Sequence, residues 1–321
     1  MCPAPIIAVT GTSGKTTTAT LIGQMLKAAG LDAIVCGNIG NPFSGEIKRI
    51  KKDSAVVLEV SSFQLELTDK FKPAVSVILN ISDNHLDRHK DMEEYITAKC
   101  RIFLNQDEKG LLFLNKNDEL LREIASVVKG PKVEFFNEYK DLGKRYNILN
   151  EDYLAAMSAA SAMNAAEAVM LKVIENFKGI EHRLEAVANI NGVDFINDSK
   201  ATTISSVEWA LKSLGENIIL IIGGRYKGGD FGLLKGLVRK KVDYIISIGE
   251  ARPQIKNGLE GVKPIFEADN FTDAVSEGFK KAKKGGRVLL SPGCSSFDMF
   301  KDYEERGKIF KELVNEIRKS K

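Results

Sequence analysis

The chain has 321 residues, which is enough for about two domains of ordinary size. Its composition, 44% hydrophobic and 28% charged, is typical of globular proteins. The net charge is only +3, from 46 basic and 43 acidic residues, and this balance argues against a dedicated nucleic-acid surface. No apolar run is long enough to span a membrane, and the four cysteines are scattered without a Cys-x-x-Cys pair. We therefore expect a cytoplasmic protein with reduced thiols and no zinc site.

The most informative segment is the stretch 6–18, which reads Ile-Ile-Ala-Val-Thr-Gly-Thr-Ser-Gly-Lys-Thr-Thr-Thr. Its four apolar residues predict a buried strand, and helical spacing resumes over residues 19–29. The loop between them can turn backbone N–H groups toward a phosphate, Lys15 adds a positive charge, and Thr16 can hold Mg²⁺. The loop is shorter than the full Gly-x-x-x-x-Gly-Lys-Ser/Thr pattern, so a polar strand-to-helix turn is the alternative. We favour a site for ATP or a related nucleotide.

Short apolar runs alternate with helical patterns along the first half of the chain. The expected strands there are residues 6–9, 33–36, 55–60, 74–80, 111–114 and 133–136. Their uninterrupted apolar character predicts burial on both faces, and hence a largely parallel sheet. One long helix is expected over residues 151–175, and the pattern breaks over 177–181. We place a domain boundary at this break, giving domains 1–180 and 181–321.

The second half repeats the alternation of strands and helices. The expected strands are residues 193–196, 217–222, 242–248, 263–266 and 287–290, and the expected helices are 204–214, 231–240, 272–284 and 299–319. The fold class is therefore α/β, with a P-loop ATPase-like central domain followed by a Rossmann-like C-terminal domain.

Three side chains in the first half are candidates for chemistry. Glu59 ends a buried strand beside the phosphate loop, where it could bind Mg²⁺; the alternative is a carboxylate that faces water. His85 follows the next strand and could ligate a metal or orient a phosphate, or could be a capping or surface residue. Lys99 lies one helix later, and its own pattern indicates an ordinary solvated lysine.

In the second half, polar loops follow three predicted strands. These loops are residues 197–202, 223–230 and 291–296. Three such loops on one edge of a parallel sheet form the usual crevice for a small ligand, and their lysines and hydroxyls suit an anionic one. Ordinary Gly-rich turns would explain any single loop, but they explain all three poorly.

Taken together, these motifs resemble the Mur ligase family. The strings that carry the resemblance are Thr10–Thr17, Gly37–Gly40, Leu58–Glu66, His85–Arg88, Ala98–Lys99, His182–Arg183, Asn197–Thr202 and Leu289–Phe300. The Ser-Ser-Phe-Gln and Asp-Ser-Lys-Ala-Thr strings are the specific ones. They resemble the family members that join D-glutamate to UDP-N-acetylmuramoyl-L-alanine, consuming ATP and forming an acyl phosphate on the way.

The resemblance implies ATP and two Mg²⁺ ions as cofactors, with Lys15, Glu59, His85 and Lys99 as catalytic residues. Lys99 matches a lysine that the family carbamylates, which would turn a cation into a carboxylate-like Mg²⁺ ligand. The implied metal ligands are Thr16, Glu59, His85 and Lys99. The implied nucleotide contacts are Gly11, Thr12, Ser13, Gly14, Lys15, Thr16, Thr17, Asn147, Asn150, Arg183 and Asp198. The implied contacts to the UDP-sugar are Asn38, Ser61 and Gln64, and those to the incoming amino acid are Lys200, Thr202, Lys227, Ser296 and Tyr303.

The chain departs from the family pattern at three places. Ser13 stands where the family usually has Asn, and only Asn147 and Asn150 represent the Asn-x-x-Asn pair on the adenine side. Because five residues precede the first strand, we expect the N-terminal domain that grips the uridine diphosphate to be absent and ligation to be impaired. A monomer without nucleic-acid or membrane partners is expected. The alternatives are a non-catalytic remnant that binds ATP or a partner, and a ligase for a smaller acid.

Overall fold

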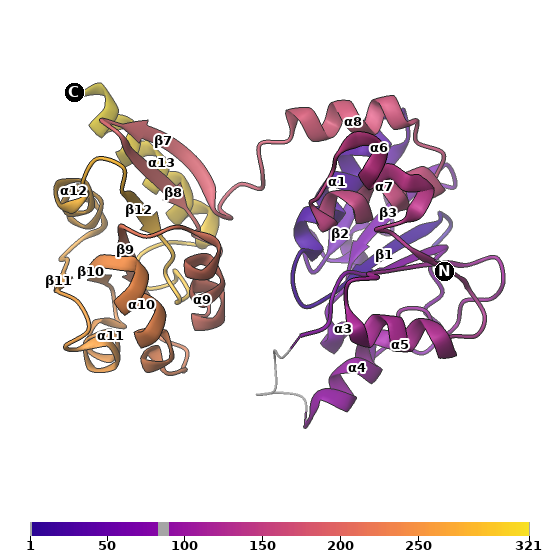
Figure 1. Ribbon diagram of the computed structural model, residues 1–321, viewed down its shortest axis with the longest axis horizontal. Helices are drawn as coiled ribbons and strands as arrows, with labels where there is room; N and C mark the ends of the chain where they lie inside the picture. The colour runs from indigo at the N-terminus through magenta and orange to yellow at the C-terminus, as the bar shows by residue number, and fades with distance from the viewer. Residues whose placement is uncertain (1, 83–89, 321) are drawn as a thin grey trace. The chain divides into compact units, whose positions relative to one another are not determined.

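The computed structural model describes residues 2–82 and 90–320, and within them the chain forms two compact units (Figure 1). The first unit is Met1–Phe177 and the second is Lys178–Lys321, and each is built around its own six-stranded sheet. None of the helices in the described part of the chain is long and apolar enough to cross a membrane.

The sheet of the first unit is entirely parallel. Its strands are β1 (Ile6–Thr10), β2 (Asp32–Gly37), β3 (Ser54–Glu59), β4 (Val75–Ile78), β5 (Leu111–Leu114) and β6 (Lys132–Phe135), in the spatial order β2-β3-β1-β4-β5-β6. The order reverses at the central strand β1, because β2 and β3 lie on one side of it and β4 to β6 on the other. In sheets of this kind, ligands bind outside the carboxyl ends of the strands at such a reversal.

Helices cover both faces of this sheet (Figure 1). One face carries α1 (Lys15–Ala28), α6 (Leu142–Tyr146), α7 (Glu151–Ala162) and α8 (Glu167–Asn176), and the other carries α3 (Ser62–Glu66), α4 (Met92–Cys100) and α5 (Glu119–Val127). Two further short elements are α2 (Phe43–Glu46), which follows β2, and the 3₁₀ turn η1 (Tyr139–Asp141). The single helix expected over 151–175 is wrong: Asn164 has a φ of 65°, a left-handed conformation that ends α7 before α8 begins.

The sheet of the second unit is mixed. Its strands are β7 (Glu185–Ile190), β8 (Val193–Asn197), β9 (Ile218–Gly223), β10 (Val242–Ile248), β11 (Ile265–Glu267) and β12 (Arg287–Leu290), in the order β11-β10-β9-β12-β8-β7. The first of these, β7, is not among the predicted strands. It pairs antiparallel with β8 through the turn at Asn191 and Gly192, whose φ angles of 54° and 81° are those of a tight hairpin.

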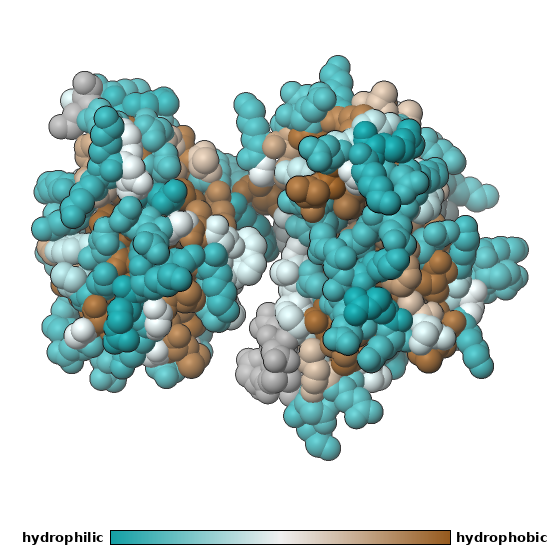
Figure 2. All heavy atoms as spheres, in the orientation of Figure 1, coloured by the Kyte–Doolittle hydropathy of each residue, from teal (hydrophilic) through white to brown (hydrophobic). Residues whose placement is uncertain are grey.

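Helices also cover both faces of the second sheet. One face packs against α9 (Ile204–Ser213), α10 (Lys235–Lys241) and α11 (Arg252–Leu259), and the other against α12 (Phe271–Lys281) and α13 (Tyr303–Lys319). The helix expected over 231–240 is instead the 3₁₀ turn η2 (Phe231–Leu234) followed by α10. Polar side chains cover much of the face of each unit that Figure 2 shows. The buried apolar residues form one cluster on each face of each sheet.

Candidate functional site

The predicted phosphate loop connects β1 to α1 at the point where the strand order reverses. Gly14 precedes α1 with a φ of 80°, and the start of this helix carries no side-chain cap. The helix therefore begins with backbone N–H groups and a positive dipole end that suit an anion. Asn80, which follows β4, holds the loop in place, since its side-chain oxygen accepts a hydrogen bond from the Ser13 N–H at 2.9 Å.

Two lysines converge on one carbonyl of this loop. The Nζ of Lys15 donates to the carbonyl oxygens of Gly11 and Thr12, at 2.7 and 2.9 Å. The Nζ of Lys99 donates to the same Gly11 carbonyl at 2.9 Å and lies 4.4 Å from the centre of the Tyr95 ring. Lys99 is only 1% exposed, so the interpretation of this residue as a solvated lysine is wrong. Burial, with the nearby charge of Lys15, lowers the pKa of Lys99 to about 6.

Glu59, at the end of β3, is also buried beside the loop. Its neighbour in the sheet register is Val9, two residues before Gly11, and its side chain is 2% exposed. One carboxylate oxygen, Oε1, accepts a hydrogen bond from Asn38 Nδ2 at 2.8 Å, whereas Oε2 is buried with no hydrogen-bond partner among the described residues. The alternative of a carboxylate facing water is therefore excluded. A buried oxygen without a donor is costly, and a hard cation such as Mg²⁺ would satisfy it.

The other residues expected at the metal and sugar sites differ in their surroundings. Thr16 is 4% exposed in the first turn of α1. Ser61 and Gln64 form the capping box of α3, because Ser61 Oγ accepts a hydrogen bond from the Gln64 N–H and Gln64 Oε1 accepts one from the Ser61 N–H. This box orients both residues at the carboxyl edge of the sheet. The position of His85 lies outside the described residues.

The start of α7 carries the implied nucleotide contact Asn150 and, next to it, residues that the motifs did not reveal. Asn150 caps this helix, because its Oδ1 accepts a hydrogen bond from the Tyr153 N–H at 3.2 Å, and Asn147 ends the short helix α6 in a left-handed conformation. The residue in contact with the phosphate loop is Asp152. A Cβ added to Gly14 would lie 2.1 Å from its Oδ1 atom.

A cluster of amides surrounds the neighbouring Glu151. The side-chain nitrogens of Asn115 and Asn117 donate to its carboxylate at 2.8 and 2.7 Å, and that of Asn137 at 3.4 Å. Asn115 follows β5 and Asn137 lies just beyond β6, so the cluster ties the carboxyl ends of two strands to α7. Asparagines directly after predicted strands could have indicated this cluster from the sequence. Asparagine is also common in ordinary turns, so the pattern is not specific.

In the second unit, the three polar loops are joined at one edge of the sheet, as the sequence predicted. The Gly293 N–H donates to the Ala201 carbonyl and the Gly223 N–H to the Pro292 carbonyl, each at 2.8 Å. Arg306 of α13, which is 1% exposed, donates from its guanidinium to the carbonyls of Ser199 and Cys294. The burial of Arg306 was not predicted, because its partners Ser199 and Cys294 lie in loops 107 and 12 residues away along the chain.

The expected ligand contacts of this unit are arranged around these loops. Asp198 is buried, and its carboxylate accepts hydrogen bonds from Ser291 Oγ and the Leu184 N–H. Burial raises the pKa of Asp198 to about 7. The remaining residues differ in burial: Ser296 is buried, Thr202 is half-buried and Arg183 is exposed. The Nζ atoms of Lys200 and Lys227 lie 5.3 Å from the centre of the Tyr303 ring and 5.2 Å from that of the Phe297 ring, respectively.

Gly223 is expected to be essential for the geometry of this edge. It has a φ of 128°, and a Cβ placed there would lie 2.0 Å from the Ile248 carbonyl oxygen. Gly223→Ala should therefore lower the free energy of unfolding by more than the roughly 1–3 kcal/mol of backbone strain alone. Gly236→Ala in α10, where a Cβ meets no atom within 4 Å, is the matched control. Denaturant unfolding of both variants checks this, and equal midpoints would contradict it.

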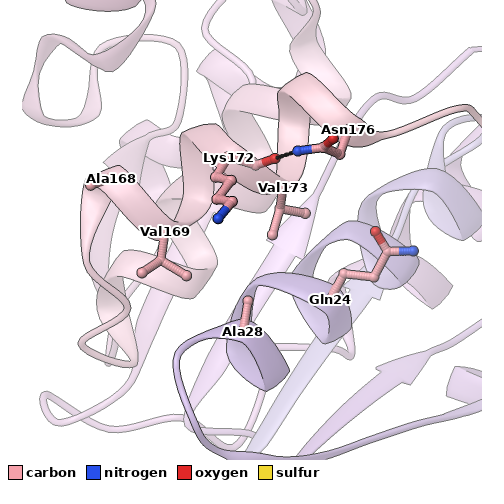
Figure 3. A pocket seen from close by; sticks show the side chains of 7 residues that line it. All are labelled: Gln24, Ala28, Ala168, Val169, Lys172, Val173 and Asn176. Carbon is pink, nitrogen blue, oxygen red and sulfur yellow. Dashed lines mark hydrogen bonds between the residues drawn. The ribbon is translucent and has the colours of Figure 1, made fainter.

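A groove of about 620 Å³ lies elsewhere, between α1 and α8 (Figure 3). Gln24 and Ala28 line it from the carboxyl-terminal half of α1, and the α8 side is lined by Ala168, Val169, Lys172, Val173 and Asn176. Because Lys15 stands at the opposite end of α1, this groove is not part of the phosphate-loop site.

The fold and the site define a nucleotide-dependent enzyme of two α/β units, one of which carries a phosphate loop. Comparisons with known families match residues 9–151 to the Mur ligase middle domain and residues 182–294 to the Mur ligase, glutamate ligase domain. The chain is 40% identical over 342 residues to the UDP-N-acetylmuramoylalanine--D-glutamate ligase of Caldicellulosiruptor bescii, and this match covers 97% of the chain and 75% of the relative. It is 41% identical to the ligase of the same name from Pelotomaculum thermopropionicum, with 98% and 76% covered.

Solved structures share the fold at lower identity. The MurF ligase of Thermotoga maritima in complex with ADP has a TM-score of 0.70 at 16% identity, with 98% of this chain and 81% of that chain covered. E. coli FolC in complex with DHPP and ADP has a TM-score of 0.68 at 17% identity, with 98% and 90% covered. The chain belongs to the Mur ligase family. As a member of that family, it is an ATP-dependent, ADP-forming amide ligase.

Proposed function

We propose that the protein joins D-glutamate to UDP-N-acetylmuramoyl-L-alanine at the expense of ATP. The observation that carries the proposal is the convergence of Lys15 and Lys99 on one phosphate loop, with the orphaned carboxylate oxygen of Glu59 at the end of the adjoining strand β3. The names of the relatives at about 40% identity supply the substrates. We place the reaction in the cytoplasm, where ATP is available, with the protein acting as a monomer.

In this proposal the phosphate loop holds the triphosphate. Residues 11–17 offer backbone N–H groups and hydroxyls, and Lys15 exchanges its two loop carbonyls for phosphate oxygens. Glu59 and Thr16, with Lys99 and His85, hold the two Mg²⁺ ions, which when bound offset the charge on the transferring phosphoryl group. Glu59 Oε2 supports this assignment because it is a buried carboxylate oxygen that lacks a donor among the described residues.

Lys99 is proposed to act as a carbamate. The lone pair of its Nζ attacks the carbon of CO₂, and an N–H proton is released to solvent, so that an ammonium donor becomes an anionic oxygen donor. Only the neutral amine can react in this way. The pKa of about 6, lowered mainly by burial, keeps most of the side chain neutral at pH 7.

The bond-forming chemistry then has two steps. A carboxylate oxygen of the acceptor acid attacks the γ-phosphorus of ATP, which releases ADP and forms an acyl phosphate. The amino group of D-glutamate attacks the acyl carbon, loses a proton and expels phosphate. Asn38, Ser61 and Gln64, at the carboxyl edge of the first sheet, are proposed to contact the acid near its reacting end, while Asn147, Asn150, Arg183 and Asp198 contact the nucleotide.

The second unit is proposed to bind D-glutamate. Lys200 and Lys227 can pair with its two carboxylates, and Thr202, Ser296 and Tyr303 can hydrogen-bond to them. Both lysines face aromatic rings at about 5 Å, which holds the ammonium groups close to the joined loops.

Steady-state release of ADP tests the proposed function. We expect release that requires both UDP-N-acetylmuramoyl-L-alanine and D-glutamate, and much less with L-glutamate. Release with a smaller carboxylic acid in place of the UDP-sugar would favour a ligase for that acid. Nucleotide binding without release for any acid would favour the non-catalytic alternative.

D-Glutamate is expected to raise the unfolding temperature of the wild-type chain more than L-glutamate does. A ligand present at 100 times its dissociation constant stabilises a protein by about 2.7 kcal/mol. Lys227→Ala should reduce this shift, whereas Lys240→Ala, an exposed lysine in α10, should leave it unchanged. Thermal unfolding monitored by fluorescence measures both effects. Equal protection by the two enantiomers would contradict the assignment.

A further inference from the structure

Asp152 places a carboxylate directly against the phosphate loop. It is the second residue of α7, and a Cβ built on Gly14 would lie 2.1 Å from its Oδ1 and 3.0 Å from its Oδ2. The start of α7 is fixed by the Asn150 cap and by the contacts of α7 along α1. The backbone that carries this carboxylate is therefore positioned by the packing of two helices.

No partner neutralises this carboxylate among the described residues: none of their hydrogen bonds or ion pairs involves it. Burial, and then the adjacent charge of Glu151, raise the pKa of Asp152 to about 6. The strands β4 and β5, which pack against α7, carry no charged residue. The charged groups on the helices that pack against α7 are Lys15 and Lys27 of α1, Lys144 and Arg145 of α6, and Glu167, Lys172 and Glu175 of α8. Lys140 of η1 also faces α7, because its Nζ donates to Ser161 Oγ.

We propose that Asp152 makes nucleotide binding proton-linked, so that its carboxyl group takes up a proton when a polyphosphate occupies the loop. This inference rests on the proposed function, in which the loop binds ATP. A phosphate bound to the loop N–H groups lies well within one Debye length, about 8 Å, of the carboxylate. Two like charges at that range disfavour the ionised acid, whereas the protonated acid can donate its O–H.

The direction of the pH effect follows from this arrangement. The pKa of Asp152 must be higher in the nucleotide complex than in the free protein, because the bound phosphate disfavours the carboxylate. Affinity is then greatest below the free-state pKa of about 6 and falls as the pH rises above it, by up to about tenfold per unit until the pKa of the complex is reached. The carboxylate thus weakens nucleotide binding at alkaline pH.

Calorimetric titration with Mg·ADP at pH 6, 7 and 8 tests the proposal. The ratio of wild-type to Asp152→Asn affinity should fall from pH 6 to pH 8, by up to about 50-fold if the pKa in the complex lies above 8. Taking this ratio removes the titration of the nucleotide phosphate itself, whose pKa is about 6. Glu123→Gln, an exposed acid on α5, should follow the wild type. Repeating the wild-type titration in buffers of different ionisation enthalpy should show net proton uptake beyond that of Asp152→Asn.

Four other results of these titrations would contradict the proposal. Parallel pH profiles for the wild type and Asp152→Asn would overturn the proposal. A ratio that rises with pH would also overturn it, because the ionised carboxylate would then be accepting a hydrogen bond from the nucleotide. If Asp152→Asn does not fold, the number of protons that the wild type takes up on nucleotide binding is the deciding measurement. Uptake no greater than the titration of the nucleotide phosphate accounts for would then overturn the proposal. Absence of binding by either protein at every pH would refute the ATP site, and this inference with it.

Discussion

Lys15→Ala is expected to abolish most of the affinity of the chain for Mg·ATP. The Lys15 ammonium is held over the loop by the carbonyls of Gly11 and Thr12, so its charge is already positioned where phosphate oxygens would bind. A hydrogen bond to a charged group contributes about 1.5–3 kcal/mol, which corresponds to roughly 10- to 150-fold in affinity. Because the charge on the transferring phosphoryl group grows in the transition state, turnover should fall further, on the order of 10²–10³.

Calorimetry and ADP release measure the two parts of this expectation. Lys27→Ala is the matched control, because Lys27 is an exposed lysine in the last turn of the same helix. It should bind Mg·ATP as the wild type does. Equal affinity of Lys15→Ala and the wild type for Mg·ATP would contradict the assignment of this loop as the phosphate site.

The strand-loop-helix that carries Lys15 could be predicted from sequence because its determinants are local. Four apolar residues form β1, the left-handed Gly14 turns the chain, and α1 begins at the next residue. Gly30, with a φ of 87°, follows the end of α1, where a glycine commonly ends a helix. The parallel sheet was predictable for the same reason, since each buried strand is a continuous apolar run.

The features that residue patterns alone missed depend on contacts between distant residues, and only the family resemblance implied a role for Lys99. Lys99 meets the Gly11 carbonyl across 88 residues, and nothing in its own helix indicates that it is buried. Asp152 meets Gly14 only because α7 packs along α1. The break between α7 and α8 was missed because the alanine-rich stripe continues through Asn164, whose conformation alone ends the helix.

Lys99→Ala is the second variant with a large expected effect. It should fold, because the loss of a buried, mostly neutral amine removes a desolvation cost as well as one hydrogen bond to Gly11. Turnover should nevertheless fall on the order of 10²–10³, because the anionic oxygen proposed to hold Mg²⁺ is lost. Lys109→Ala, an exposed lysine of the same unit, should keep wild-type turnover.

Chemical rescue separates a carbamate from a merely structural lysine. Acetate or formate can enter the space left by the Lys99 side chain and supply the missing carboxylate oxygens, so added salts of these acids should restore part of the turnover of Lys99→Ala. Chloride at equal ionic strength should not. With ¹³C-labelled CO₂, the wild type should give a carbamate signal that the variant lacks. Full turnover of Lys99→Ala without added carboxylate would show that the position of Lys99 beside the loop serves packing alone.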